Sequence, residues 1–392
     1  MGPAFILARA RPLWEYRAPD DTDWPGSSSR SISDCWTFFR RARKIAMEME
    51  KAQVARRRDL SGKGGAMSVL VTGGAGYIGS VIGERLAELV PRVVVLDNLA
   101  QGHRAAVSER ATFVAGDIAD RCLVEEIIRH HQVTAVVHLA AESGIERSMS
   151  DPSLFFRENV FKGMALLDAM LACGVDRIVF SSSAAVYGEP RSTPITEGHP
   201  QDPVSPYGES KRTFERILDW YHQAHPLRYV ALRYFSAAGA SSRFGEDHDP
   251  ESHLVPLVLE TALGRRDHVD IFGTDYDTAD GTCVRDFVHV ADLAEAHILA
   301  LEALGRIESG AYNLGSGDGH SILEVIETAR RVTGRPIPTV NAPRRSGDPA
   351  VLVASPARAK KELGWQPKHQ DLQEIVQSAW DWHRAHPNGY GS

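Results

Sequence analysis

The sequence predicts an α/β protein built around a doubly wound parallel sheet, with a smaller mixed α/β region after it. Three observations predict this fold class. Short apolar segments alternate with helical patterns, the apolar segments are continuous rather than alternating, and a glycine-rich loop joins the first strand to the first helix. Continuous apolar strands with helical crossovers are typical of a parallel sheet covered by helices on both faces.

The elements can be placed in order from Met67 onward. The first strand is expected at 68–72, and the helix after its loop runs to about Leu89. Further strands are expected at 92–97, 112–115, 133–139 and 177–181, and helices at 152–173, 290–304 and 321–333. Gly, Asp, Pro and His become frequent between 239 and 282, which predicts a less regular second region there.

The composition argues against several classes of protein. The chain has 392 residues and a net charge of -7, whereas a nucleic-acid binder would usually carry a basic surface. No stretch approaches about 18 consecutive apolar residues, so no membrane-spanning helix is expected. The four cysteines form no CxxC pair and no Cys/His cluster with zinc spacing, so no metal site is expected. These observations favour a cytoplasmic protein that acts on a small molecule.

The glycine-rich loop lies at 73–79, directly after the first strand. Gly73, Gly76 and Gly79 form the pattern GxxGxxG. Glycines let the backbone turn tightly and approach a pyrophosphate, and the N-terminus of the next helix offers free N–H groups and a positive dipole end. A glycine triplet alone also fits an ordinary tight turn. Because a strand precedes this loop and a helix follows it, we interpret it as the dinucleotide site of a Rossmann fold.

An acidic residue at the end of the second strand indicates which dinucleotide is bound. Asp97 lies 21 residues after Gly76, near the offset of about 20 that a ribose-binding carboxylate shows. A carboxylate there accepts hydrogen bonds from the ribose 2′-OH and repels a 2′-phosphate, so NAD is favoured over NADP. Asp117, with Ile118, either closes the adenine pocket or simply begins the helix near Asp120. The sequence leaves both interpretations open.

A Tyr-x-x-x-Lys pattern provides the candidate catalytic residues. Tyr207 and Lys211 share one face of a helix, and a nearby ammonium lowers the pKa of a phenol, so Tyr207 is a candidate general base. Ser183 follows the fifth strand, and ligands bind at the carboxyl ends of parallel strands. The pattern also occurs by chance on exposed helices. Its position downstream of a dinucleotide loop favours a catalytic role, with Ser183 binding the reacting hydroxyl.

Together these motifs resemble the extended short-chain dehydrogenase/reductase superfamily and, within it, the UDP-glucose (UDP-galactose) 4-epimerases. The similar motifs are VTGGAGYIGS at 71–80, LDN at 96–98, SSSAAVYG at 181–188, SPYGESK at 205–211, RYFSAAGA at 233–240, GEDHDPESHLVP at 245–256, IFGTDY at 271–276, DGTCVRDFVHVADLAEAH at 280–297, YNLGSG at 312–317 and RRSGDP at 344–349. The resemblance covers essentially all of 67–392.

The resemblance implies a role for each matching residue. The catalytic residues are Ser183, Tyr207 and Lys211. The NAD-binding residues are Gly73, Gly76, Tyr77, Ile78, Gly79, Asp97, Asn98, Asp117, Ile118, Ala140, Asn159, Tyr207 and Lys211. The residues that bind the UDP-sugar are Ser183, Tyr207, Ser236, His253, Leu254, Phe272, Arg285, Arg345 and Asp348. In this set Arg285 and Arg345 bind the pyrophosphate, since arginine's fork of donors suits a diphosphate. Without the resemblance, Arg285 would be read as a surface partner of Asp286.

The chain departs from the family pattern at three places. The family often has a lysine in the segment where this chain reads Ala-Ala-Glu-Ser-Gly at 140–144, so one contact to a cofactor phosphate is expected to be absent or replaced. Ser236 stands where the family usually has Asn. Leu352, of intermediate size, occupies the position thought to control access of bulky N-acetyl sugars.

The activity that the resemblance implies is the interconversion of UDP-glucose and UDP-galactose, through a transient 4-keto sugar and enzyme-held NADH. Alternatives are a 4-epimerase of UDP-N-acetylglucosamine or a UDP-pentose, a nucleotide-sugar dehydratase, and a non-catalytic NAD-binding protein. Ala184 and Ala185 argue against the dehydratase, which needs an additional acid near the serine. The resemblance also implies a homodimer that pairs through helices including 207–211.

The sequence predicts a division of the chain into three parts. Residues 1–66 hold scattered Trp, Pro, Ser and Arg without a sustained period, apart from a candidate helix at 35–58. We expect a disordered extension there, or an upstream extension of a start that belongs at Met67. Residues 67–240 are expected to form the NAD-binding Rossmann domain, and 241–392 the UDP-sugar-binding region, with segments that return to the Rossmann sheet.

Overall fold

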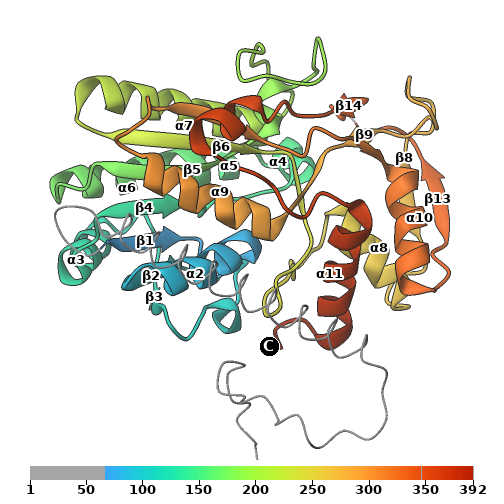
Figure 1. The fold of residues 1–392 in the computed structure, drawn as a ribbon, viewed down its shortest axis with the longest axis horizontal. Coiled ribbons are helices and arrows are strands. Elements are labelled where there is room, and N and C mark those ends of the chain that lie inside the picture. The colour runs from blue at the N-terminus through green and yellow to red at the C-terminus, as the bar shows by residue number, and fades with distance from the viewer. Residues whose placement is uncertain (1–66, 346, 392) are drawn as a thin grey trace, which may run out of the picture. The chain divides into compact units, whose positions relative to one another are not determined.

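The computed structural model describes residues 67–345 and 347–391, which belong to one compact unit (Figure 1). Its central sheet has seven strands in the order β11-β6-β5-β4-β1-β2-β3, and every neighbouring pair is parallel. The strands are β1 (Ser68–Thr72), β2 (Arg92–Asp97), β3 (Thr112–Ala115), β4 (Ala135–His138), β5 (Arg177–Ser183), β6 (Arg228–Tyr234) and β11 (Gly310–Leu314). The doubly wound parallel sheet predicted from the sequence is confirmed.

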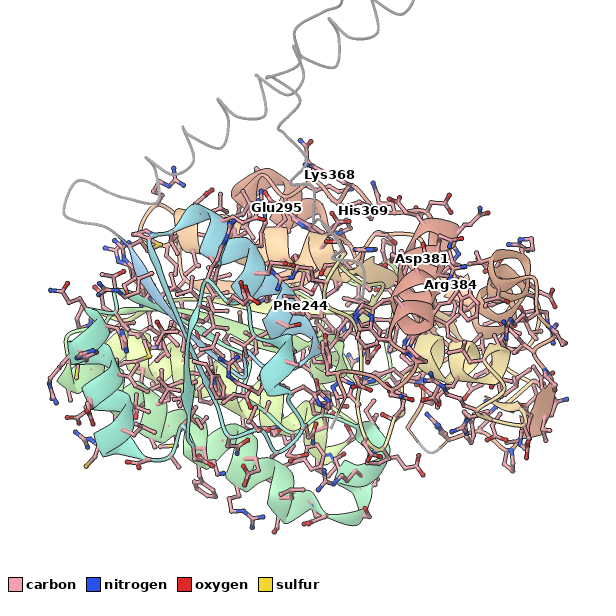
Figure 2. All side chains as sticks on the ribbon, turned by 90° about the horizontal axis from the view of Figure 1, so that it is seen from below. Phe244, Glu295, Lys368, His369, Asp381 and Arg384 are labelled. Atoms are coloured by element: carbon pink, nitrogen blue, oxygen red, sulfur yellow. The ribbon has the colours of Figure 1, made fainter. Side chains whose placement is uncertain are left out.

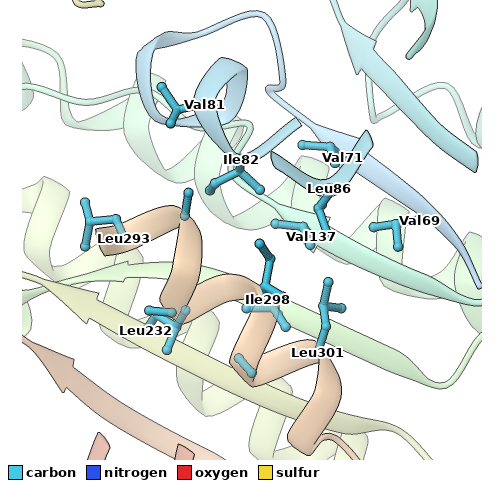
Figure 3. Packing of buried hydrophobic residues seen from close by; sticks show 14 of the residues in the cluster. Val69, Val71, Val81, Ile82, Leu86, Val137, Leu232, Leu293, Ile298 and Leu301 are labelled. Atoms are coloured by element: carbon cyan, nitrogen blue, oxygen red, sulfur yellow. The ribbon is translucent and has the colours of Figure 1, made fainter. Parts of the chain in front are cut away.

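Helices cover both faces of this sheet (Figure 1). One face packs against α2 (Tyr77–Leu89) and α9 (Val290–Ala303), and the other against α3 (Arg121–His131), α6 (Lys162–Ala172) and α7 (Pro206–Ala224). Side chains of β1 alternate between the two faces of the sheet. Val69 and Val71 pack with residues of α2 and α9, as Figure 3 shows, whereas Leu70 packs in the hydrophobic cluster on the other face. Successive strand residues point to opposite faces. A strand that is buried on both faces therefore has a continuous apolar sequence.

Three predicted boundaries are corrected by the structure. The helix expected at 152–173 is divided into α5 (Pro152–Phe156), a π-helical turn η3 (Arg157–Phe161) and α6. The fifth strand does not end at 181 but continues to Ser183, because β5 stays paired with β6 up to Tyr234. β4 is shorter than 133–139, because the residues at both ends of that range make hydrogen bonds outside the strand ladder.

The second half of the chain forms smaller units. Its elements are β7 (Ser236–Ala238), α8 (Leu254–Ala262), β8 (Val269–Phe272), β9 (Val284–Arg285), β10 (Phe287–His289), β12 (His320–Ser321), α10 (Ile322–Thr333), β13 (Thr339–Ala342), β14 (Val351–Leu352), η5 (Ala359–Leu363) and α11 (Leu372–Ala385). The strands form two two-stranded sheets, β10-β7 and β13-β8, and one three-stranded sheet, β12-β9-β14. Residues of α8, α10 and α11 pack in a separate hydrophobic core. β11 returns to the main sheet beside β6. The expected domain boundary at 240 stays a prediction.

One buried carboxylate ties the C-terminal segment to α9. Asp292 accepts hydrogen bonds from the backbone N–H of Lys368 at 2.9 Å and of His369 at 2.8 Å, two residues that Figure 2 labels. The indole N–H of Trp365 donates to the carbonyl of Asp292 at 2.9 Å. The segment that leads into α11 is therefore fixed against a helix of the main sheet.

The remaining described elements are short: η2 (Arg104–Ala106), α4 (Ile145–Ser150) and η4 (Ala184–Tyr187). Within residues 67–345 and 347–391, no helix has the length and apolar character needed to cross a membrane. The predictions for residues 1–66, including the helix at 35–58, lie outside the described residues.

Candidate active site

The glycine loop connects β1 to α2 and has the shape that close approach of a phosphate requires. Gly73 has φ +70, and a Cβ there would lie 2.5 Å from the backbone nitrogen of Ala140. A Cβ on Gly79 would lie 2.2 Å from the carbonyl oxygen of Gly73. Gly76 precedes the first turn of α2, and no side chain caps that end of the helix. The N–H groups of the first turn are thus available to an anion.

Asp97 lies beside this loop and is held in place by backbone donors. Its Oδ2 accepts the N–H of Ala75 at 2.9 Å, and its Oδ1 accepts the N–H of Leu99 at 2.8 Å. The carboxylate is buried at the end of β2. Each carboxylate oxygen has a second lone pair, so Asp97 can still accept from a ribose hydroxyl. The residues at this edge fit NAD.

Asp117 makes a contact that the sequence did not indicate. Its Oδ2 accepts a hydrogen bond from Lys162 at 2.6 Å, and its Oδ1 accepts the N–H of Ala119 at 2.9 Å. Burial raises the pKa of Asp117, but the hydrogen bonds outweigh it, so the pKa lies below its usual value. The cap of α3 is Asp120, which accepts the N–H of Leu123. The interpretation of Asp117 as the residue that begins this helix is wrong.

Asn159, expected to contact the cofactor, uses its amide within the protein. Its Oδ1 accepts the N–H of Glu142 at 2.7 Å, and its Nδ2 donates to the carbonyl of Glu142 and to the hydroxyl of Ser210, at 3.1 and 2.9 Å. It joins the loop after β4 to α7. The Glu142 carboxylate contacts Gln101 at 2.7 Å and Arg147 at 2.8 Å, near the position where the family lysine is missing.

The candidate catalytic residues Ser183 and Tyr207 come together at the carboxyl end of β5. Ser205 caps the N-terminus of α7 and Pro206 begins it, which places Tyr207 in the first turn. Burial raises the pKa of the Tyr207 phenol above its usual value, and a hydrogen bond with Ser183 lowers it in part. The Ser183 hydroxyl also accepts the N–H of Ala185 at 3.1 Å. The structure thus places both residues where α7 packs against the end of β5.

Lys211 lies close to Tyr207 but is directed elsewhere. Its Nζ donates to the carbonyl of Ser181 at 2.9 Å, and it lies 5.9 Å from the centroid of the Tyr207 ring. Burial lowers the pKa of Lys211 to about 7, and the Glu215 carboxylate opposes this shift. The expectation that Lys211 lowers the pKa of Tyr207 is not met in this structure, because burial of the phenol dominates its pKa.

A buried ion pair supports this helix and was missed in the sequence. Arg233 of β6 lies 2.6 Å from Glu215, one turn beyond Lys211 on α7, and both side chains are buried. Ser182 donates a hydrogen bond to the same carboxylate, and Arg233 donates to the hydroxyl of Tyr187 at 2.7 Å. The signal was the spacing of four residues between Lys211 and Glu215, which places an acid on the catalytic face of the helix.

A pocket of about 210 Å³ gathers four of the residues expected to bind the UDP-sugar: Leu254, Phe272, Arg345 and Asp348. The guanidinium of Arg345 lies 3.8 Å from the centroid of the Phe272 ring. Arg285 makes an ion pair with Asp348, so it joins this group. A flat aromatic ring beside two guanidinium groups and a carboxylate can hold a base, a diphosphate and a ribose.

Ser236 and His253 are not among the residues that line this pocket. The backbone N–H of Ser236, on β7, donates to the carbonyl of Asp286 at 2.8 Å. His253 faces Glu246 and Glu251. Asp286 is buried and accepts backbone N–H groups of the 316–317 loop, so the alternative of an Arg285–Asp286 surface pair is wrong. Leu352 packs against the small core that follows Ser183.

Comparisons with known proteins agree with this arrangement. Residues 69–315 match the family described as "NAD dependent epimerase/dehydratase family". The UDP-glucose 4-epimerase of Halalkalibacterium halodurans is 51% identical over 329 residues, 83% of this chain and 98% of that protein. The structure of a UDP-glucose 4-epimerase from Brucella ovis in complex with NAD is 44% identical, with a TM-score of 0.78, over 81% of this chain and 98% of that one.

A further solved structure carries both kinds of ligand. The UDP-glucose 4-epimerase from Bifidobacterium longum in complex with NAD⁺ and UDP is 36% identical, with a TM-score of 0.79, over 82% of this chain and 100% of that one. The chain therefore belongs to the NAD dependent epimerase/dehydratase family and, within it, to the UDP-glucose 4-epimerases.

Proposed function

We propose that the protein interconverts UDP-glucose and UDP-galactose by inverting C4 of the sugar, with NAD as its cofactor. The observation that carries this proposal is the placement of Ser183 and Tyr207, where β5 ends at Ser183 in the same sheet as the glycine loop and Tyr207 lies in the first turn of α7, which packs against β5. Relatives at about half identity are UDP-glucose 4-epimerases, and their names support the same reaction.

The reaction needs a base, a hydride acceptor and an anchor. When bound, NAD⁺ supplies the hydride acceptor, and the glycine loop with Asp97 would hold it. Tyr207, as the phenolate, removes the proton of the 4-hydroxyl while Ser183 holds the oxygen of that hydroxyl. Loss of this proton and of the C4 hydride converts the carbon to a ketone. In its protonated form, Lys211, whose Nζ lies 5.9 Å from the centroid of the Tyr207 ring, would stabilise the phenolate.

The uridine diphosphate end is held apart from the sugar. Arg285 and Arg345 are proposed to bind the diphosphate, with Phe272 beside the base and Asp348 on the ribose. A firmly bound nucleotide with a loosely bound sugar lets the keto sugar turn and present its other face. Tyr207 then returns the proton to the oxygen as C4 is reduced. Binding energy from the remote nucleotide orients the reacting carbon.

We also propose a homodimer that pairs through helices including α7. Phe161, at the end of η3, is 66% exposed, and Trp220, on α7, is 61% exposed. Exposed large aromatic side chains are enriched where proteins associate. Light scattering tests this proposal, and a fully active monomer would contradict it. The cytoplasmic location expected from the sequence stays a prediction.

The activity is tested by incubating the purified protein and NAD with UDP-galactose, UDP-N-acetylgalactosamine or UDP-arabinose, and separating the products. Conversion of UDP-galactose to UDP-glucose at the highest rate supports the proposal. Faster conversion of one of the other sugars would establish an epimerase of another UDP-sugar instead. Absence of any conversion would contradict the catalytic role of the Ser183–Tyr207 pair.

A further inference from the structure

Four potential metal ligands gather in the segment that leads into α8. They are Glu246, His248, Glu251 and His253, and one ligand atom from each lies within 4.8 Å of all the others. The sequence places them at the spacing E-x-H-x-x-E-x-H. Glu246 is buried, whereas the His253 side chain is 43% exposed. None of these residues transfers a proton or a hydride in the epimerisation proposed above, although the resemblance implies that His253 contacts the sugar nucleotide.

The imidazole nitrogens lie close to the carboxylate oxygens. Nδ1 of His253 lies 2.8 Å from a Glu246 oxygen and 3.0 Å from a Glu251 oxygen. Nδ1 of His248 lies 3.2 Å from that same Glu246 oxygen and 3.9 Å from the second oxygen of Glu251. An imidazole Nδ1 carries at most one hydrogen. Each Nδ1 therefore faces two acidic side chains with only one proton to share between them.

Glu251 is pre-oriented for such a role. Its Oε1 accepts the backbone N–H groups of Ser252 at 2.6 Å and His253 at 2.7 Å. These bonds fix the carboxyl group and leave Oε2 directed toward His248. On the other side, the His248 ring stands edge-on to the Tyr77 ring, with 6.5 Å between the centroids. Two of the four side chains are thus held by neighbours outside the cluster.

We propose that Glu246, His248, Glu251 and His253 bind one divalent transition-metal ion, with Zn²⁺ as the best match. Imidazole and carboxylate ligands with bonds of about 2.0–2.2 Å are typical of Zn²⁺, and a tetrahedral arrangement puts ligand atoms roughly 3.3–3.6 Å apart. Mg²⁺ and Ca²⁺ prefer sites made of oxygen atoms alone. The histidine–glutamate distances are 2.8 to 3.9 Å, and one ligand atom from each of the four residues lies within 4.8 Å of the others, so shifts of about 1 Å would bring the four atoms to this geometry.

The ion would fasten a segment that connects two parts of the site. His248 contacts Tyr77 at the start of α2, next to the glycine loop. His253 is the N-cap of α8, and both Glu251 and Leu254 line the pocket assigned to the nucleotide. A bound ion would cross-link the turn from 246 to 253 without any change in the reacting groups. The expected effect is greater stability of the folded enzyme when the ion is present.

The experiment measures metal binding by the full-length protein. Protein treated with a chelator and desalted is mixed with ZnCl₂, desalted again and analysed for zinc, and its affinity is measured by competition with a chromophoric chelator. Wild type is expected to retain one Zn²⁺ per chain and to melt at a higher temperature with it. Co²⁺ in place of Zn²⁺ should produce visible absorption bands of a four-coordinate ion.

Two variants test the ligands. His248→Ala and Glu251→Gln should each weaken Zn²⁺ binding by about 100-fold or more. Replacing a residue that only hydrogen-bonds a metal ligand already costs about 10–100-fold in affinity, and these two residues are proposed to be ligands themselves. His268→Ala is the matched control, since His268 pairs with Asp270 at 3.5 Å on the surface outside the cluster. Circular dichroism checks that each variant is folded.

The competing explanation is a cluster of charged histidines paired with glutamates. In that case wild type retains no Zn²⁺ after desalting, or His248→Ala and Glu251→Gln bind it as tightly as wild type. Either result overturns the proposal. Because the readout is bound metal, this outcome is independent of whether the protein epimerises UDP-sugars.

Discussion

The Nη2 atom of Arg233 lies 2.6 Å from Oε2 of Glu215, and the Nε of the same guanidinium donates to the other carboxylate oxygen at 3.0 Å. This two-point contact joins β6 to α7 within the protein interior. The side chains are only 4% and 7% exposed. Because Glu215 lies one turn after Lys211, the pair sets the position of the helix that carries both Tyr207 and Lys211.

Glu215→Gln is expected to destabilise the fold strongly. Removing one partner of a buried ion pair leaves the other charge unpaired, which costs about 3–5 kcal/mol. Urea unfolding followed by circular dichroism measures the change. Arg384→Ala, which breaks the exposed pair with Asp381 labelled in Figure 2, is the control and should leave the midpoint unchanged. If both variants unfold at the wild-type midpoint, the buried pair does not hold α7.

Lys211 should make the stability of the NAD-free protein depend on pH. Burial lowers its pKa to about 7, whereas an unfolded lysine titrates near 10.4. Between these values the unfolded chain binds more protons than the folded chain, so this residue's contribution to the free energy of unfolding rises with pH. The slope is at most about 1.4 kcal/mol per pH unit.

The comparison for this prediction is Lys211→Met, which removes the titrating group but keeps a long apolar chain. Urea unfolding of both proteins at several pH values between 6 and 9 gives the difference in free energy. The wild type should gain stability relative to the variant as pH rises above 7. A difference that does not change with pH would mean that Lys211 is charged in the folded protein throughout this range.

Local patterns made the cofactor edge of the site predictable. A Cβ at Gly73 or Gly79 would clash with backbone atoms, so both positions require glycine. This requirement is visible in the sequence as the glycine pattern itself. Asp97 is the last residue of β2 and lies 21 residues after Gly76, so its position beside the loop could be predicted without the rest of the chain. Tyr207 and Ser183 are also marked locally, by a helix and by a strand end.

Long-range pairing was not predictable in the same way. Arg285 and Asp348 are 63 residues apart. The helical spacing places Glu215 on the same face of α7 as Lys211, but it does not identify Arg233 of β6 as the partner of Glu215. The pairing of β11 with β6 likewise depends on the whole fold. The cluster of Glu246, His248, Glu251 and His253 has no cysteine and only two histidines, so it lacks the Cys/His spacing of a zinc site. Two of its four potential ligands are glutamates.

Asp97→Ala is expected to weaken NAD binding by about 10–100-fold, because a hydrogen bond to a charged group contributes about 1.5–3 kcal/mol. Discrimination against NADP should fall, since the repulsion between the carboxylate and a 2′-phosphate is removed. Titration calorimetry with each dinucleotide measures both effects. Asp120→Asn, at the cap of α3, serves as a control for the loss of an acid at this edge of the sheet. An unchanged ratio of the two affinities in Asp97→Ala would show that another residue selects NAD.

Tyr207→Phe should keep the fold and bound NAD but lose most of the epimerisation. The change deletes one oxygen from an aromatic side chain that packs edge-on against Phe155, with 6.2 Å between the ring centroids, so the packing should hardly alter. What disappears is the phenol oxygen, which is proposed to take the 4-hydroxyl proton. General base catalysis contributes about 10²–10⁴-fold, so the rate should fall by at least that order.

Tyr221→Phe, on the same helix but bonded to Asp168 at the surface, removes an equivalent hydroxyl and should keep the wild-type rate. The test is conversion of UDP-galactose by proteins matched for bound NAD and circular dichroism. A Tyr207→Phe enzyme that turns over like Tyr221→Phe would place the general base elsewhere, because the two variants differ only in which hydroxyl is lost.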